Sequence, residues 1–189
     1  MTEERHESIR SVCTLLDQGE YDNASYLIDS DYPFIPIKKN SRTYTPREMT
    51  KVFLRDGFID RYRGTHLVYP PVLRVISHNL PKSFPYHNNW KMDEGHFAYW
   101  ELFPTIDHIV PVSRGGEDIE SNWVCCSMIT NSIKSNWLLE ELEWTLKEPG
   151  NLTDWDGMIS WFIQHISSKP ELLKIPYIKS WYYTAKEVM

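Results

Sequence analysis

The stretch that decides the fold is Thr105-Ile-Asp-His-Ile-Val-Pro-Val-Ser-Arg-Gly-Gly116, followed by Asn122-Trp-Val and by Asn131-Ser-Ile-Lys134. Residues 105–112 predict a strand, in which the neighbouring side chains of Asp107 and His108 leave opposite faces. Gly115 and Gly116 predict a hairpin turn after this strand. Lys134 comes three residues after Asn131 and therefore lies on the same face of a helix. We expect a strand, a turn and a helix in this order.

The composition of the whole chain is that of a packed globular protein. Its 189 residues are 41% hydrophobic and 14% aromatic, which excludes a largely disordered chain. Three cysteines, Cys13, Cys125 and Cys126, are spaced for neither a disulfide framework nor a zinc tetrad. No apolar run reaches the roughly 18 residues of a membrane span, and residues 1–17 are too charged for a secretory signal. We therefore expect a cytoplasmic protein with no membrane partner.

The charge is distributed unevenly along the chain. The formal net charge of -6 by itself argues against nucleic acid as a partner. Residues 32–63, however, carry eight basic and three acidic side chains, a local charge of +5. Affinity for a polyanion follows the local potential, so this segment could face phosphate groups. Alternatively, it could be a solvated face that pairs with acidic neighbours.

A chain of this length fits one domain, and we expect a single domain over residues 1–189. Apolar positions at helical spacing, broken near Gly19, predict two short helices at its start. Between residues 64 and 100 no regular period is found. The expected parts are an N-terminal helical cap and basic connector (1–45), the core (46–140) with an insert (65–104), and C-terminal helices (141–189).

Further helices are predicted by local signals. Thr45-Pro46-Arg47-Glu48 combines an N-cap threonine with a proline at the first helical position, which predicts a helix through Phe53. Proline at position 176 is expected to interrupt the last helix. The other predicted helices are Trp137–Trp144, Trp155–Ile166 with Thr153 or Asp154 as its cap, and Lys169–Val188.

The central stretch resembles the HNH endonuclease family. The motif of that family is usually written Asp-His-Ile-x-Pro-x-Ser-x-Gly-Gly, then Asn, then His or Asn with a Lys three residues later. Asn122 and Asn131 follow His108 by 14 and 23 residues, which are usual intervals for the family. The resemblance implies an α+β fold, in which a small β-hairpin plus helix (the ββα-metal nuclease core) is wrapped by N- and C-terminal helices and an aromatic-rich insert. It also implies a metal-dependent endonuclease acting on DNA.

The residues of the motif suit the hydrolysis of a phosphodiester. This reaction needs a base to deprotonate water and a cation to stabilise the transition state and the leaving 3′ oxygen. His108 can be the base, because an ordinary imidazole is mostly neutral at neutral pH. The resemblance assigns Asp107 and Asn131 to the metal, and Asn122 to orienting His108 through backbone bonds across the loop. Contacts with DNA phosphates are expected from Lys134, Arg114, Arg55 and Arg61.

The expected metal ligands are one carboxylate and one amide oxygen, a set that favours one Mg²⁺ or Mn²⁺. Many relatives also carry two Cys-x-x-Cys pairs that bind a structural zinc, but here Asp60, Arg63, Ser127 and Thr130 stand at those positions. We therefore expect no structural zinc. In its place we expect hydrogen bonds of Asp60 with Arg63 and of the two hydroxyl groups, together with extra aromatic packing. Cys125 and Cys126 are expected in a strand near the helix start.

Several alternatives remain open. The insert at 65–104 could be a recognition element that stacks aromatic rings on bases, or a hydrophobic flap over the hairpin. The chain could be a non-catalytic nucleic-acid-binding module on an HNH scaffold, or a nuclease for RNA or for one nucleic-acid structure. Because one nuclease site cuts one strand, cleavage of both strands would require a homodimer or two sequential nicks.

Overall fold

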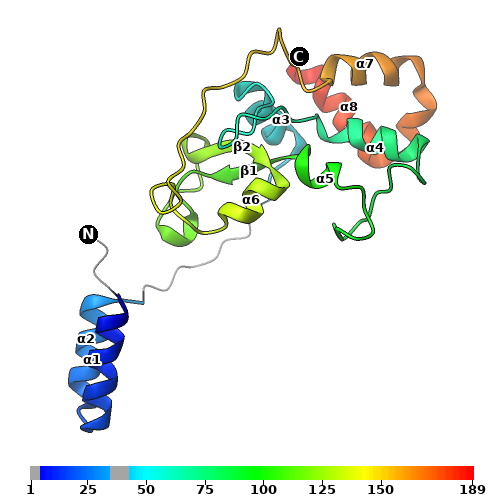
Figure 1. Cartoon of the computed structure of the whole chain (residues 1–189). Coiled ribbons are helices and arrows are strands. Elements are labelled where there is room, and N and C mark those ends of the chain that lie inside the picture. Colours follow the sequence, from blue (N-terminus) through cyan, green and yellow to red (C-terminus); the bar gives the residue numbers. More distant parts are fainter. Residues whose placement is uncertain (1–4, 35–42) are drawn as a thin grey trace. The chain divides into compact units, whose positions relative to one another are not determined.

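A computed structural model describes residues 5–34 and 43–189. The chain divides into two units, Met1–Ser41 and Arg42–Met189 (Figure 1). This division differs from the single domain that the sequence analysis expects. The part of the basic connector at residues 35–42 lies outside the described residues.

The first unit consists of two helices, α1 (Arg5–Asp17) and α2 (Tyr21–Asp31), that pack on each other. Gly19 lies between them with a φ of +75°, a backbone conformation that glycine adopts without strain. The two short helices predicted from the apolar spacing are confirmed, but they belong to a unit of their own.

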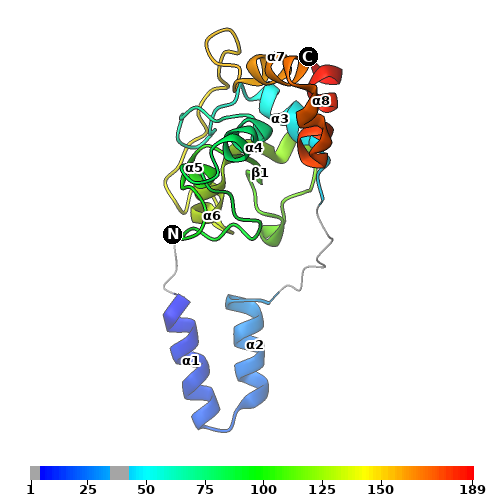
Figure 2. The same ribbon diagram turned by 90° about the vertical axis from the view of Figure 1, so that its right-hand side faces the viewer.

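The second unit combines helices with a small sheet, in agreement with the expected α+β class (Figures 1 and 2). Its two strands are antiparallel, with Asp107 opposite Val124 and His108 opposite Trp123. The described elements in chain order are α3 (Pro46–Arg55), α4 (Pro70–Asn79), α5 (Ala98–Glu101), β1 (Pro104–His108), η1 (Val112–Arg114), η2 (Glu120–Asn122), β2 (Trp123–Ser127), α6 (Met128–Lys134), α7 (Ile159–Ser168), η3 (Pro170–Lys174) and α8 (Pro176–Val188).

The β1–β2 hairpin contacts both α3 and α6 (Figure 1). Ile106 and Cys125 belong to the main core, which also includes buried side chains of α3. Val124 and Cys126 belong to a second apolar cluster. Because side chains alternate along a strand, the two clusters mark the two faces of the hairpin. The side chains of neighbouring residues of β1 therefore lie in different surroundings.

Helix α3 begins as the sequence predicts. Thr45 accepts a hydrogen bond from the backbone N–H of Glu48 at 3.2 Å, and the Glu48 carboxylate accepts one from the backbone N–H of Thr45 at 2.8 Å. This second bond is the main reason why the pKa of Glu48 lies below its ordinary value. Pro46 occupies the first turn, and the helix ends at Arg55 rather than at Phe53.

Helix α4 lies within the stretch 64–100, where the sequence analysis finds no period. Pro70 and Pro71 occupy its first turn, where a missing N–H removes no intrahelical hydrogen bond. The helix buries Val72 and Val75, among others. The prolines thus begin a helix here and do not mark a loop.

Two predicted helices of the C-terminal part differ in the structure. Residues 137–144 form a series of turns, and the backbone φ is +48° at Ser135 and +56° at Glu143, values that interrupt a helix. Helix α7 begins four residues later than predicted. Its first turn is bonded by Asp156, whose carboxylate accepts the N–H groups of Met158 and Ser160.

The last predicted helix is interrupted before Pro176, as expected, and is divided into η3 and α8. Together with α4 and α7, α8 lies at the end of the unit away from α6 (Figure 1). No helix of the described residues is long and apolar enough to span a membrane.

Several aromatic rings of the insert at 65–104 pack into the protein. Tyr99 and Phe103 are buried beside Leu73, and Trp90 contacts both rings edge-on, at centroid distances of 5.9 and 4.7 Å. Burial raises the pKa of Tyr99 to about 12, and its hydroxyl donates to the Leu73 carbonyl. These contacts favour the hydrophobic flap over the recognition element.

Asp60, Arg63, Ser127 and Thr130, the four residues expected from the resemblance to stand at zinc-ligand positions, are joined in pairs by hydrogen bonds. Asp60 is fully buried and accepts hydrogen bonds from the backbone N–H groups of Tyr62 at 3.0 Å, Arg63 at 3.1 Å and Ser127 at 3.0 Å. The Ser127 hydroxyl donates to Oγ1 of Thr130 at 2.8 Å. The expected hydrogen bonds are present, although Arg63 contributes its backbone to them. A carboxylate thus joins the 58–64 turn to the end of β2.

We expect Asp60→Ala to lower the free energy of unfolding by about 3 kcal/mol or more, because three N–H groups would lose a charged acceptor in the protein interior. Urea unfolding followed by circular dichroism measures this change. Glu148→Ala removes an exposed carboxylate and is the control, with an expected change below about 0.5 kcal/mol. A loss for Asp60→Ala as small as that of the control would contradict the role of Asp60.

Candidate functional site

His108 ends strand β1 in polar surroundings, although only 5% of it is exposed. Its Nε2 lies 2.7 Å from Oδ1 of Asp118 and 3.5 Å from the Tyr44 hydroxyl. Trp123, opposite His108 on β2, donates from Nε1 to the same Asp118 oxygen at 2.9 Å. Tyr44 donates to it at 3.0 Å. The imidazole is therefore part of a hydrogen-bonded network and is not enclosed by apolar side chains.

Asp118 is an ionised carboxylate at neutral pH. Its partial burial raises its pKa, but the hydrogen bonds from His108, Trp123 and Tyr44 outweigh this effect, and the pKa is lowered below its ordinary value. An ionised carboxylate only accepts hydrogen bonds. The network around His108 therefore has a charged acceptor at its centre.

Asp107 projects to the other face of β1 and is 7% exposed. Its Oδ2 accepts a hydrogen bond from the Tyr62 hydroxyl at 2.7 Å, and Nζ of Lys134 lies 3.0 Å away. Burial and the neighbouring Asp107 raise the pKa of Tyr62, so the phenol remains a donor. The carboxylate therefore has both a neutral and a charged partner.

Lys134 does not present its ammonium group to DNA, which corrects the expectation from the sequence. The side chain is fully buried, and Nζ donates to the backbone carbonyl of His108 at 2.7 Å as well as pairing with Asp107. A carboxylate that is taken out of water needs a cation nearby, and Lys134 supplies it from the last turn of α6.

Asn131 also extends from α6 to strand β1. Its Nδ2 donates to Oγ1 of Thr105 at 3.1 Å and to the Ile106 carbonyl at 3.4 Å. The amide oxygen of Asn131 and the Oδ1 atom of Asp107 accept no hydrogen bond from any residue that the structure describes. Both atoms therefore remain available as oxygen ligands.

Asn122 bonds the backbone across the loop between the strands, as the sequence predicts. Its Oδ1 accepts from the N–H of Val110, and its Nδ2 donates to the Val110 carbonyl, both at 2.9 Å. Gly116 lies against this pair, and a Cβ atom there would collide with the Val110 carbonyl oxygen and the Asn122 amide. The loop that carries Asp118 is thus fixed by an amide and by the absence of a side chain.

The three arginines expected to contact DNA form contacts within the protein. Arg55 and Arg61 each lie 2.9 Å from Oδ1 of Asp56, which is fully buried. Arg114 pairs with Glu141 at 2.9 Å, and both side chains are about one third exposed or less. Arg55 and Arg61 therefore neutralise a buried carboxylate, whereas Arg114 has only a partly exposed partner.

The donor atoms fit a magnesium-like ion held by few protein ligands. No group of three or more His, Cys, Asp or Glu side chains that could hold a metal occurs within residues 5–34 and 43–189. Mg²⁺ often binds through one or two protein oxygens and keeps water and phosphate oxygens as its other ligands. Asp107 and Asn131 provide two such oxygens.

In the insert, His87 pairs with Glu94 and His96 stacks on Phe84.

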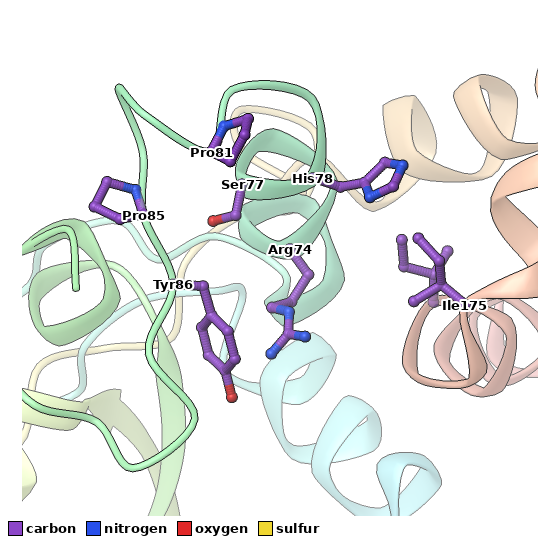
Figure 3. A pocket seen from close by; sticks show the side chains of 8 residues that line it. Arg74, Ser77, His78, Pro81, Pro85, Tyr86 and Ile175 are labelled. Carbon is purple, nitrogen blue, oxygen red and sulfur yellow. The ribbon is translucent and has the colours of Figure 1, made fainter. Parts of the chain in front are cut away.

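Two of the cavities in the second unit are lined by aromatic and basic side chains and lie outside the network of His108. One, of about 260 Å³, opens beside α4, where the Arg74 guanidinium lies over the ring of Tyr86 (Figure 3). The same guanidinium also lies 5.0 Å from the centre of the Tyr177 ring. The other, of about 470 Å³, is lined in part by Tyr62 and by the exposed side chains of Arg63 and Lys147. The second cavity shares Tyr62 with the site, because the Tyr62 hydroxyl donates to Asp107.

Some residues of the site were not found from the sequence. Tyr44, Tyr62 and Trp123 stand in no recognisable pattern with His108, and only the fold brings them to it. Asp118 follows Gly116 by two residues, and the sequence analysis gives it no role. Its position in the loop next to the motif is the one signal that could have singled it out.

No protein-family model, curated protein or solved structure matches this chain. The interpretation of the site therefore depends on its own residues and contacts. The resemblance to HNH endonucleases is carried by the sequence motif alone.

We expect Lys134→Met to lower the free energy of unfolding by about 3–5 kcal/mol, because the largely buried Asp107 would lose its cation. Adding Asp107→Asn is expected to restore much of this loss, because the amide carries no charge. Urea unfolding of both single variants and of the double variant gives the coupling energy. If the two losses simply add, the two groups do not form a buried pair.

Proposed function

We propose that the protein is a metal-dependent endonuclease of the HNH kind that hydrolyses phosphodiester bonds in DNA. The observation that supports it most is that α6 is bonded to the strand that carries Asp107 and His108. Asn131 donates to β1, and Lys134 bonds both Asp107 and the His108 backbone. One hairpin-and-helix unit, the ββα-metal core of this proposal, thus combines a base with two oxygen ligands.

In the proposed reaction, His108 accepts a proton from the attacking water at Nδ1. The water oxygen forms the new bond to phosphorus, while the bond from phosphorus to the 3′ oxygen breaks and leaves its electron pair on that oxygen. The 3′ oxygen takes a proton from solvent, and the products are a 5′-phosphate and a 3′-hydroxyl group. His108 then releases its proton to solvent.

Asp107 and Asn131 would hold one Mg²⁺ or Mn²⁺ through the two oxygens that have no partner among the described residues. When bound, this ion would supply positive charge to the transition state and to the leaving 3′ oxygen. Tyr62 and Lys134 hold the Asp107 carboxylate in place through its Oδ2 atom. Asn122 fixes the loop beside His108 through Val110.

Contacts with the phosphate backbone would come from cations that are not committed to the interior. Arg63 and Lys147 are exposed beside the cavity next to Tyr62. Arg114 could exchange Glu141 for a phosphate, because a partly exposed ion pair stabilises a protein by only about 0–1 kcal/mol. The enzyme would act in the cytoplasm, where its cysteines remain reduced.

A second candidate is a non-catalytic nucleic-acid-binding module on the same scaffold. The observation that favours it is the pairing of Asp107 with Lys134, which already neutralises the carboxylate without a metal. The low exposure of His108 points in the same direction. In this case the folded protein would retain DNA at low salt without a divalent ion and would not nick it.

We expect His108→Ala to reduce the nicking of supercoiled plasmid in Mg²⁺ or Mn²⁺ by about 100-fold or more, because the attacking water would lose the side chain proposed to accept its proton. His78→Ala, which removes an exposed histidine of α4, is the control and is expected to cleave like the wild type. Circular dichroism shows whether each variant is folded. Undiminished cleavage by folded His108→Ala would exclude His108 as the base.

The same assay separates the remaining alternatives. Asn131→Ala is expected to raise the concentration of Mn²⁺ needed for half-maximal cleavage, because it removes one of two ligands. Rates on duplex DNA, single strands, junctions and RNA show which substrate is preferred. Linear product that appears together with nicked plasmid would indicate a homodimer, whereas nicked plasmid that accumulates first would indicate single sites.

A further inference from the structure

We propose that Asp118 is the positioning residue of His108: it fixes the imidazole so that Nε2 carries the hydrogen and Nδ1 keeps its lone pair for the attacking water. This inference rests on the proposed function and adds a residue to it. Asp118 acts through His108 and does not itself contact the substrate.

The first argument is the direction of the hydrogen bond between the two residues. Nε2 of His108 and Oδ1 of Asp118 are 2.7 Å apart, a distance typical of a charge-assisted bond. Because Asp118 is ionised, it has no hydrogen to donate, so the imidazole must donate. In a neutral imidazole only one nitrogen bears a hydrogen, and Nδ1 is then the acceptor.

The second argument concerns the other ring nitrogen. Nδ1 of His108 has no hydrogen-bond partner among the residues that the structure describes. Within the same residues, Nε2 of His165 is the one buried side-chain nitrogen or oxygen that lacks a partner. Nδ1 of His108 therefore reaches solvent, although the residue as a whole is buried. A water molecule can therefore approach Nδ1, because no described protein group donates a hydrogen bond to this atom.

The third argument is that Asp118 is itself held from two further sides. The indole N–H of Trp123 and the hydroxyl of Tyr44 donate to the same oxygen that His108 uses. The two rings also touch edge-on, with centroids 5.0 Å apart. Trp123 is paired with His108 across the strands, so the acceptor is anchored to the same hairpin as the base. One oxygen atom thus sets the orientation of the ring.

The experiment compares Asp118→Ala with Asp118→Asn. The alanine variant has no acceptor, whereas an asparagine can offer its amide oxygen to the same three donors. Glu117→Ala, which removes the neighbouring carboxylate, is the control. The ¹⁵N chemical shifts of the His108 ring, measured at about pH 8.5 where an ordinary imidazole is neutral, report which nitrogen carries the hydrogen. Cleavage of plasmid gives kcat and KM for each protein.

We expect the wild type, Glu117→Ala and Asp118→Asn to show hydrogen on Nε2, and Asp118→Ala to show a mixture of both tautomers. We also expect kcat to fall about 10- to 100-fold for Asp118→Ala, to recover in large part for Asp118→Asn, and KM to change less than about twofold. Hydrogen on Nδ1 in the wild type, or wild-type kcat in Asp118→Ala, would overturn the proposal.

The cleavage assay and the ¹⁵N chemical shifts test the proposed function and the role of Asp118 independently. If the wild type does not cleave any substrate, the proposed function is wrong, while the ¹⁵N shifts still decide whether Asp118 sets the tautomer. If Asp118→Ala does not fold, the comparison of Asp118→Asn with the wild type decides, and a tautomer on Nδ1 in the asparagine variant would overturn the role of the acceptor.

Discussion

An ammonium group inside the protein, that of Lys134, joins helix α6 to strand β1. It binds both the Asp107 carboxylate and the backbone carbonyl of His108, so one group holds these two neighbouring residues of β1. Loss of either Lys134 or Asp107 would be costly, because the other charge would then be buried without compensation. Two other buried carboxylates, those of Asp56 and Asp60, accept hydrogen bonds from backbone N–H groups of β2 and so attach the segment after α3 to this strand. The second unit thus uses buried charges to join segments that are far apart in the chain.

The elements that could be predicted from the sequence are those that depend on residues close in the chain. The helix after Thr45 could be predicted because its N-cap threonine and the proline at its first position are neighbours in the chain. Helix α4 could not be predicted, because a pair of prolines such as Pro70 and Pro71 occurs both in the first turn of a helix and in loops. The turns at 137–144 were taken for a helix, since the unusual backbone angles at Ser135 and Glu143 leave no mark on the sequence.

The candidate site likewise contains residues that could be predicted from the sequence and residues that could not. The resemblance to the HNH motif was sufficient to name Asp107, His108 and Asn131 together, and it also led to the expected loop contact of Asn122. Spacing could not show that Lys134 is buried, because this depends on the carboxylate that it meets in the folded protein. Residues contributed by other segments could not be predicted for the same reason. Those residues are Tyr44 and Tyr62, which precede the motif by more than forty positions.

The alternation of side chains along β1 makes the length of this strand critical. If a single residue were deleted ahead of Asp107, the strand could keep its pairing only by turning every later side chain to the opposite face. His108 would then take the place of Asp107 beside Lys134, and the carboxylate would turn to the face on which Ile106 packs in the main core, so that Lys134 would lose its carboxylate partner. Insertions and deletions should therefore be far rarer in this strand over evolutionary time than exchanges of one apolar residue for another.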